Sequence, residues 1–511
     1  MMAEPERTTF PVESAFDGAL VGAKHAPREP ASRAALLDAI AAALDRQRDA
    51  IIAVTSEETA LTPDELAPEF ARMTGTLRMF ADLVREGSWV RAAIDPASPG
   101  GEGVIGPNHD VRRMLMPLDG VVAVFGASNF PLAYGVCGGD TASALAAGCA
   151  VVVKEHPAHP RTGRLIARTA QQAIADAGAS PGLLGYVEHT DPRDHSVAGA
   201  ILRHPALAAV GFTGSVGGGR AIDRLARERD HPVPVFAEMG SVNAVVVSAA
   251  AAERRAEETA NLLADSILAR VGQQCTRPGL ILAPEDADAF VHALAARIAA
   301  APVRDMLAPW IHESYLRRLE EVSQTPGVQR LTPQRDAPGP RAAPPALFKV
   351  NQRSFIEHPA LREEIFGPAA IVVGVARDMN LSDIPLPRAL VCSVLDDSTD
   401  ERGGAGVTWS RLALQHLSGL AGRVAFNTPP TGVRVAHGMS HGGPWPATNR
   451  PDTTAVGPYA IERWCRPVCF QNCPDSLLPP ELQDANPRGI LRLIRGIPTR
   501  DPVIRGGSRT A

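Results

Sequence analysis

The chain has 511 residues and a formal net charge of −5, and this length predicts two or three domains rather than one core. The acidic balance argues against a nucleic-acid-binding protein, and no apolar run is long enough to cross a membrane. Residues 1–7 lack the basic-then-apolar pattern of a signal peptide, and the seven cysteines are scattered along the chain. We therefore expect a protein of the reducing cytoplasm, with no membrane or nucleic-acid partner.

The first hundred residues predict a helical layer. Apolar residues recur with helical period from Ala34 to Leu44, and Ser32 is the expected N-cap. A second helix is expected from Asp64 to Val84, closed by Gly87. The Leu and Met side chains of these helices are expected to form core.

From about residue 120, the sequence pattern predicts short apolar strands that alternate with helices. Strands are expected at 121–125, 151–154 and 208–212, and helices at 140–147, 161–177 and 220–228. Continuous apolar strands joined by helices predict a parallel sheet covered on both faces, in a doubly wound α/β fold. Ligands of such a fold bind at the carboxyl ends of the strands.

A second α/β region begins after Val235. Its expected elements are strands at 242–247, 280–282 and 370–373 and a helix at 286–299. The Pro-rich stretch 325–346 predicts a long surface connection, and the Arg-rich tail after Pro479 predicts a solvated arm.

Cys275 stands between glycines and a proline in a polar segment that follows an amphipathic run. This setting suits a nucleophilic thiol, whereas a structural cysteine more often lies within an apolar run, as Cys149 does. On composition alone a small buried hydrophobe stays the commoner alternative.

Two polar residues at expected strand ends are candidates to act with this thiol. Asn129 can donate its amide to an oxyanion, although an ordinary turn asparagine is the alternative. Glu238, flanked by apolar residues, should have a raised pKa suited to a general base, and a solvated or paired acid is the alternative. The glycine loop 213–219 is a weak signal for diphosphate binding, because it is not the usual G-x-G-x-x-G.

Cysteines at 465, 469 and 473 and histidines at 437 and 441 recur every four residues. A zinc site is one interpretation, but the spacing fits it poorly. We predict no metal site and expect a C-terminal strand of an oligomer-forming hairpin at 465–473.

Several short motifs occur together in one order along the chain. They are Gly-Ala-Ser-Asn-Phe-Pro at 126–131, Val-Lys at 153–154, Phe-Thr-Gly-Ser at 212–215, Glu-Met-Gly at 238–240, Gly-Gln-Gln-Cys at 272–275 and Glu-Ile-Phe-Gly-Pro at 364–368. This set resembles the aldehyde dehydrogenase superfamily, and the resemblance covers roughly residues 30–488. Segments at 139–148, 156–160, 237–243 and 466–472 resemble, within it, 2-oxoglutarate semialdehyde (2,5-dioxovalerate) dehydrogenases and NADP-linked fatty aldehyde dehydrogenases.

The resemblance implies a role for each matching residue. Cys275 attacks the aldehyde, Asn129 holds the oxyanion, and Glu238 activates the water that hydrolyses the thioester. The implied cofactor residues are Lys154 at the adenosine ribose, Gly214, Ser215 and Gly219 at the pyrophosphate, Glu364 at the nicotinamide ribose, and Phe366 beside the nicotinamide. The glutamate that NAD-preferring relatives carry three residues after the lysine is Pro157 here, and the nearest acid is Glu155. NADP is therefore favoured as cofactor, with NAD as the alternative.

Three features depart from the usual pattern of this superfamily. Gln274 replaces an apolar residue before the cysteine. Arg277 is a candidate partner for a substrate carboxylate, with a structural pair as the alternative. Between residues 379 and 411, Pro385, Pro387 and a Gly-Gly pair indicate a remodelled region where relatives carry a regular helix and strand.

The resemblance implies an aldehyde dehydrogenase-like α/β fold. Its expected parts are a cofactor-binding domain (1–95 and 119–239), a catalytic domain (240–450), oligomerisation elements (96–118 and 451–480) and a C-terminal arm (481–511). The expected function is NAD(P)-dependent oxidation of a small-molecule aldehyde, 2-oxoglutarate semialdehyde, by a homodimer or homotetramer. The alternatives are an NADP-dependent medium- or long-chain fatty aldehyde dehydrogenase and a catalytically idle structural homologue. Glu238 argues against a coenzyme-A-acylating enzyme.

Overall fold

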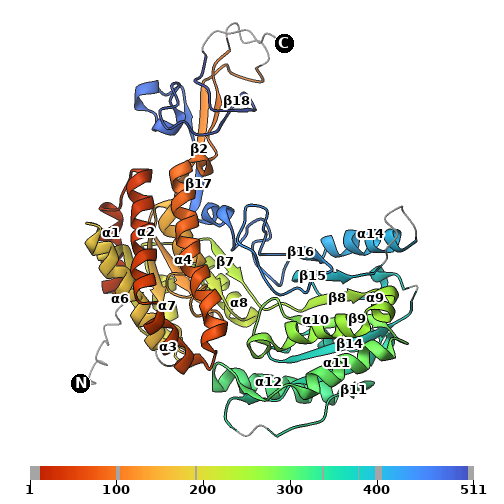
Figure 1. The fold of residues 1–511 in the computed structure, drawn as a ribbon. Coiled ribbons are helices and arrows are strands. Elements are labelled where there is room, and N and C mark those ends of the chain that lie inside the picture. The colour runs from red at the N-terminus through yellow and green to blue at the C-terminus, as the bar shows by residue number, and fades with distance from the viewer. Residues whose placement is uncertain are drawn as a thin grey trace, which may run out of the picture.

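The computed structural model describes residues 12–98, 104–189, 191, 193–336, 339–377, 379–397 and 405–504. It contains two large sheets with their helices, and a smaller sheet that projects from the body (Figure 1). None of the helices in these ranges is long and apolar enough to cross a membrane.

The first large sheet has five parallel strands in the order β5-β4-β3-β6-β7. The strands are β3 (Val121–Phe125), β4 (Ala150–Lys154), β5 (Leu184–Val187), β6 (Leu207–Thr213) and β7 (Val235–Glu238). The helices that follow them are α5 (Gly139–Ala147), α6 (Pro160–Asp176), α7 (Ser196–Arg203) and α8 (Val216–Arg227). The predicted doubly wound fold is confirmed, and the strand order reverses next to β3, where such folds bind ligands.

Four N-terminal helices complete this half: α1 (Val12–Lys24), α2 (Pro30–Arg46), α3 (Arg48–Thr59) and α4 (Pro63–Glu86). The α4 helix begins with a capping box between Thr62 and Glu65, and it ends at Gly87, whose φ is 83°. The predicted cap of α2 is wrong. The helix starts at Pro30, which suits a first helical turn, so Ser32 lies inside it.

The second large sheet has seven strands in the order β11-β13-β14-β9-β8-β15-β16, of which only the edge strand β11 runs antiparallel to its neighbour. The strands are β8 (Asn243–Val247), β9 (Pro278–Pro284), β11 (Val328–Arg330), β13 (Ala346–Asn351), β14 (Ala369–Val375), β15 (Ala389–Leu395) and β16 (Ala421–Phe426). Its helices are α9 (Ala249–Arg254), α10 (Ala256–Leu268), α11 (Asp288–Ala300), α12 (Pro309–Ser323), α13 (Gln352–Glu357) and α14 (Ala405–Ser418).

The region expected to be remodelled is regular where the structure describes it. The β15 strand is buried along its whole length between β8 and β16, and α14 follows. Pro385 and Pro387 precede the strand, so they remove no hydrogen bond from the sheet. The Gly403–Gly404 pair lies outside the described residues. The described part of this region therefore gives no support to an idle homologue.

The small sheet joins distant parts of the chain in the order β17-β2-β1-β18-β19. Its strands are β1 (Ala93–Asp95), β2 (Val111–Pro117), β17 (Cys465–Gln471), β18 (Arg492–Ile494) and β19 (Ile497–Thr499). The expected strand at 465–473 is therefore present as β17, and it pairs with β2 along seven residues.

The C-terminal residues 481–504 pack on the small sheet through β18 and β19, but most residues after Ile490 are exposed, so the predicted solvated arm fails mainly at Arg492. Arg492 is 1% exposed, and its guanidinium donates to the backbone oxygens of Gln483 and Asp501. Arg500 contacts Glu86 at 3.0 Å. Arg492 thus anchors the tail from a buried position, whereas Arg488, Arg495 and Arg500 stay exposed as predicted, and Arg505 and Arg509 lie outside the described residues.

Candidate active site

The carboxyl ends of the first sheet bring most of the predicted cofactor and catalytic residues to one edge. Asn129 follows β3, Lys154 ends β4, Ser215 follows β6, and Glu238 ends β7. Because β3, β4, β6 and β7 are parallel and adjacent, these four positions share one edge of the sheet.

The loop before Cys275 has a strained backbone. Arg270, Val271 and Gly272 all have positive φ values, of 54°, 58° and 66°. A β-branched residue rarely adopts this conformation, and each such residue costs about 1–3 kcal/mol unless its surroundings hold it. The loop therefore needs external contacts to keep this shape.

Those contacts come from both halves of the molecule. One nitrogen of the Arg270 guanidinium donates to the Glu69 carboxylate at 2.7 Å and to the Asn129 carbonyl at 2.8 Å. The guanidinium also lies 4.5 Å from the centroid of the Phe130 ring. A Cβ on Gly272 would stand 2.2 Å from the Gly367 carbonyl oxygen, so only glycine fits there.

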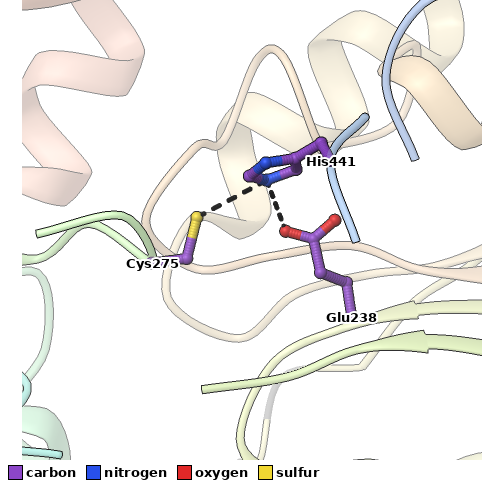
Figure 2. Close-up of side chains that lie close together, drawn as sticks. All are labelled: Glu238, Cys275 and His441. Atoms are coloured by element: carbon purple, nitrogen blue, oxygen red, sulfur yellow. Dashed lines mark hydrogen bonds and ion pairs between the residues drawn. The ribbon is translucent and has the colours of Figure 1, made fainter. Parts of the chain in front are cut away.

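Cys275, His441 and Glu238 form a compact trio (Figure 2). The Cys275 sulfur lies 3.8 Å from His441 Nε2, and that nitrogen lies 2.6 Å from a Glu238 carboxylate oxygen. His441 and Glu238 are 2% and 5% exposed. The His441–Glu238 contact is close but lacks the angles of a hydrogen bond, so both buried carboxylate oxygens have no hydrogen-bond donor among the described residues.

Burial raises the pKa of the Cys275 thiol well above its ordinary value, and the negative charges of Glu238 and Glu364 raise it further. A thiol with such a pKa is protonated at neutral pH, so it needs an adjacent base to become a nucleophile. The His441 imidazole is in position to accept that proton.

The three side chains also offer donor types that zinc takes, since their ligand atoms all lie within 4.8 Å of one another. They are the only such group in the part of the chain that the structure describes. Cys465, Cys469 and Cys473 do not belong to one.

Asn129 lies beside the catalytic loop. Its side-chain nitrogen donates to the Gln273 carbonyl at 3.0 Å, two residues before the cysteine. The amide carries a second hydrogen that this bond does not use. The Gln273 side chain in turn accepts from the Leu307 N–H at 3.0 Å, which fixes the loop from the other side.

Arg277 does not have the predicted substrate contact. Its side chain is 2% exposed, and the guanidinium donates to the carbonyls of Pro278, Ile365 and Ala369. These bonds tie the cysteine loop to the loop that carries Glu364 and Phe366. The structure therefore contradicts a carboxylate partner at Arg277, and its role is structural, although through buried bonds to carbonyls and not through the expected surface pair.

Lys154 is half-buried, and burial lowers its pKa to about 8. Its ammonium lies 2.9 Å from His189 Nδ1 and donates to the Glu155 carbonyl at 3.0 Å. The buried Glu155 carboxylate accepts from Arg164 Nε at 3.0 Å and from the Tyr186 hydroxyl at 2.9 Å. That acid is thus already engaged by partners of its own.

The glycine loop after β6 has the geometry of an anion-binding helix start. Ser215 caps α8 by accepting from the Gly218 N–H at 3.1 Å, and the Gly214 N–H donates to the Glu238 carbonyl at 3.0 Å. A side chain on Gly217 would meet nothing within 4 Å, so the backbone there is open to a ligand. Gly219 packs against Met239, where a Cβ would come within 2.5 Å of the sulfur. A diphosphate fits this arrangement.

Glu364 and Phe366 approach the first sheet from the second. A Cβ on Gly240 would be 2.4 Å from a Glu364 carboxylate oxygen, so the loop after β7 leaves just enough room for this acid. Burial raises the pKa of Glu364 to about 7, against the opposing effect of Arg277. Phe366 is half-buried two residues further on. Between them, the two sheets offer residues for both ends of a dinucleotide.

The comparison with known families now decides the class. The model of the family described as "Aldehyde dehydrogenase family" matches residues 4–382. The chain belongs to the aldehyde dehydrogenase family. It is therefore an oxidoreductase that acts on aldehydes with NAD(P).

Two curated members of the family are similar over most of their length. "Alpha-ketoglutaric semialdehyde dehydrogenase 2" of Azospirillum brasilense is 40% identical over 501 residues, which cover 97% of this chain and 91% of that protein. "Alpha-ketoglutaric semialdehyde dehydrogenase" of Acinetobacter baylyi is 38% identical over 92% of this chain and 88% of that protein. Among solved structures, the glyceraldehyde-3-phosphate dehydrogenase GapN of Methanocaldococcus jannaschii, complexed with NADP, has a TM-score of 0.74 at 18% identity and covers 90% of this chain and 93% of its own. This likeness confirms the aldehyde dehydrogenase fold.

Sequence reasoning did not find the role of His441. This residue appeared only as part of a weak metal pattern, because nothing in its local sequence points to Cys275, 166 residues away. The chain after β16 runs back to the first sheet, where Thr448 pairs with Glu238 at the end of β7, and this path brings the imidazole to the sulfur.

Proposed function

We propose that this aldehyde dehydrogenase oxidises 2-oxoglutarate semialdehyde to 2-oxoglutarate through a thioester on Cys275. The observation that supports the chemistry is the thiol–imidazole–carboxylate trio, whose ligand atoms lie within 4.8 Å of one another. The choice of substrate follows the names of the two relatives that match nearly the whole chain.

In this proposal His441 accepts the thiol proton, and the Cys275 sulfur attacks the aldehyde carbon to form a thiohemiacetal. The Asn129 amide and the Cys275 N–H stabilise the oxyanion. A nicotinamide held beside Glu364 and Phe366 would supply the acceptor for the hydride that leaves the thiohemiacetal carbon. Glu238 then removes a proton from water, which hydrolyses the thioester and frees the acid and the thiol. The net reaction is aldehyde, water and oxidised cofactor to acid, reduced cofactor and a proton.

NADP is the proposed cofactor, with NAD as the alternative. The Lys154 ammonium offers a positive charge to a 2′-phosphate. One oxygen of the Glu155 carboxylate accepts from Arg164 and Tyr186 and the other accepts from the His189 N–H, so this acid does not offer a free oxygen to ribose hydroxyls. Gly214, Ser215 and Gly219 would receive the pyrophosphate, and Glu364 and Phe366 the nicotinamide half.

The proposed oligomer is a homodimer or homotetramer formed through the small sheet. The β17 strand is its outer strand and has no neighbour on its far side among the described strands. An open strand edge readily pairs with a second chain. In this assignment, residues 96–118 and 451–480 serve assembly, while 1–95 with 119–239 bind the cofactor and 240–450 carry the cysteine.

The test of the reaction uses purified protein, NADP and 2-oxoglutarate semialdehyde, with a long-chain aldehyde in parallel. The reduced cofactor should absorb for the wild type and stay at background for Cys275→Ala. Glu238→Gln should give one burst of reduced cofactor and then slow, because the thioester forms but is not hydrolysed. Turnover by Cys275→Ala, or a preference for the long-chain aldehyde, would contradict the proposal.

A further inference from the structure

Arg72 is a half-buried cation on α4 that takes part in no ion pair among the described residues. The other arginines on this helix have acidic partners. Arg78 contacts Asp45, and Arg85 contacts Asp38 and Asp82. A guanidinium removed from water without an anion is unfavourable unless another ligand compensates it.

The acid best placed to pair with Arg72 along the helix is already used. Glu69 lies three residues earlier, but its carboxylate holds Arg270 at 2.7 Å. Its other oxygen accepts from the backbone N–H groups of Leu132 and Ala133 at 2.8 Å and 3.0 Å. Arg72 is thus left without its i−3 neighbour.

The guanidinium of Arg72 contacts Tyr134, whose ring lies near that of His441. One nitrogen donates to the Tyr134 hydroxyl at 3.0 Å, and the guanidinium carbon lies 5.2 Å from the Tyr134 ring centroid. The Tyr134 ring in turn lies 6.3 Å from the His441 ring, which contacts Cys275. Arg72 is therefore connected to the Cys275 sulfur through Tyr134 and His441.

The surroundings of Tyr134 are mainly apolar. A hollow is lined by Arg72, Tyr134, Val435 and Val456. Apolar side chains pack with Tyr134, namely Ala127, Phe130, Ala133, Val433, Val435, Met439 and Val456. The positive charge of Arg72 also reaches the sulfur, since it opposes the rise in the pKa of Cys275. The surface around Tyr134 thus combines apolar side chains with the guanidinium of Arg72, which has no ion-pair partner among the described residues.

From this geometry we infer that Arg72, supported by the Tyr134 hydroxyl, binds the carboxylate of a semialdehyde substrate and selects it over uncharged aldehydes. The inference rests on the proposed function and gives it the carboxylate contact that Arg277 does not make. Guanidinium and carboxylate form strong charge-assisted bonds, and a partly dry site strengthens them.

The test compares Arg72→Gln with the wild type on two aldehydes of equal chain length, 2-oxoglutarate semialdehyde and pentanal. For the semialdehyde, kcat/KM should fall about 10- to 100-fold, mainly through KM. For pentanal it should change by less than about threefold. Arg72→Lys should keep part of the preference, because it keeps the charge but not the forked geometry. Arg78→Gln, an exposed arginine on the same helix, is the matched control and should change neither substrate.

Equal losses on both aldehydes would assign Arg72 a purely structural role and overturn the inference, as would no change on either. Tyr134→Phe guards against misfolding of Arg72→Gln. It should raise KM for the semialdehyde by several-fold and spare pentanal, and equal effects on the two aldehydes would again overturn the inference. A wild type that does not oxidise the semialdehyde would remove the proposed function and the inference together. A wild type that does, with Arg72→Gln unchanged, would remove the inference alone.

Discussion

The two loops that build the site differ in how they are stabilised. The cofactor loop after β6 follows local rules, with Ser215 as an N-cap and glycines in the first turn of α8. The cysteine loop breaks local rules, with three consecutive residues at positive φ. The loop is held because its own Arg270 binds the distant Glu69 carboxylate and the Asn129 carbonyl. The glycine loop after β6 is thus shaped by local contacts, whereas the loop that carries Cys275 is shaped by the packing of both halves.

The difference between the two loops can be tested by adding a methyl group to each of them. Gly272→Ala should lower the free energy of unfolding by more than about 2 kcal/mol, because a Cβ there meets the Gly367 backbone and φ is positive. Activity should fall to background. Gly217→Ala is the control, since its Cβ meets nothing within 4 Å, and its free energy of unfolding should stay equal or rise. Chemical denaturation measures both, and equal stability of the two variants would contradict a packed, strained cysteine loop.

Replacing His441 tests whether this distant side chain activates the Cys275 thiol. His441→Gln should lower kcat/KM about 10²- to 10⁴-fold, because His441 is the base whose ring nitrogen contacts the Cys275 sulfur. Alkylation of Cys275 by iodoacetamide should slow in parallel. His437→Gln is the matched control, an exposed histidine on the same loop. A normal alkylation rate in His441→Gln would show that the thiol is activated by another group.

The proposed role of Lys154 in binding the cofactor predicts that the preference for NADP over NAD depends on pH. The pKa of Lys154 is lowered to about 8, so its charge is present below that pH and is lost as the pH rises through it. The ratio of kcat/KM for NADP to that for NAD should therefore decline above pH 8 by up to about tenfold per pH unit. Using the ratio cancels the titration of Cys275 and other shared groups. Lys154→Met should give a low ratio that does not change with pH. A ratio that still declines above pH 8 in this variant, as in the wild type, would contradict the assignment.

The smallest effect is expected at the cap of the cofactor loop. Ser215→Ala removes the acceptor for the Gly218 N–H and should cost about 1 kcal/mol of stability. The Michaelis constant for the cofactor should rise modestly, while the alkylation rate of Cys275 stays unchanged. Thermal unfolding and cofactor titration measure the two effects. A large change in thiol reactivity would show that the two loops are coupled more closely than their separate contacts indicate.

Residues in regular elements and at strand ends followed from the sequence. Continuous apolar strands with helices between them define a parallel sheet, and the polar residues after those strands lie at one edge for that reason alone. In the structure Asn129, Lys154, Ser215 and Glu238 lie at that edge. The substrate contact predicted for Arg277 is absent because the sequence cannot distinguish a guanidinium that faces a ligand from one that donates to three buried carbonyls.

By itself, the sequence determined the fold class, the cysteine and the strand-end residues of this aldehyde dehydrogenase, because these depend on local periodicity and motifs. Only the tertiary structure decided three other features: His441 beside the sulfur, the left-handed backbone of Val271, and an unpaired Arg72 facing Tyr134. Each depends on which distant segments pack together, and a buried charge acquires its role from the partners that packing gives or denies it.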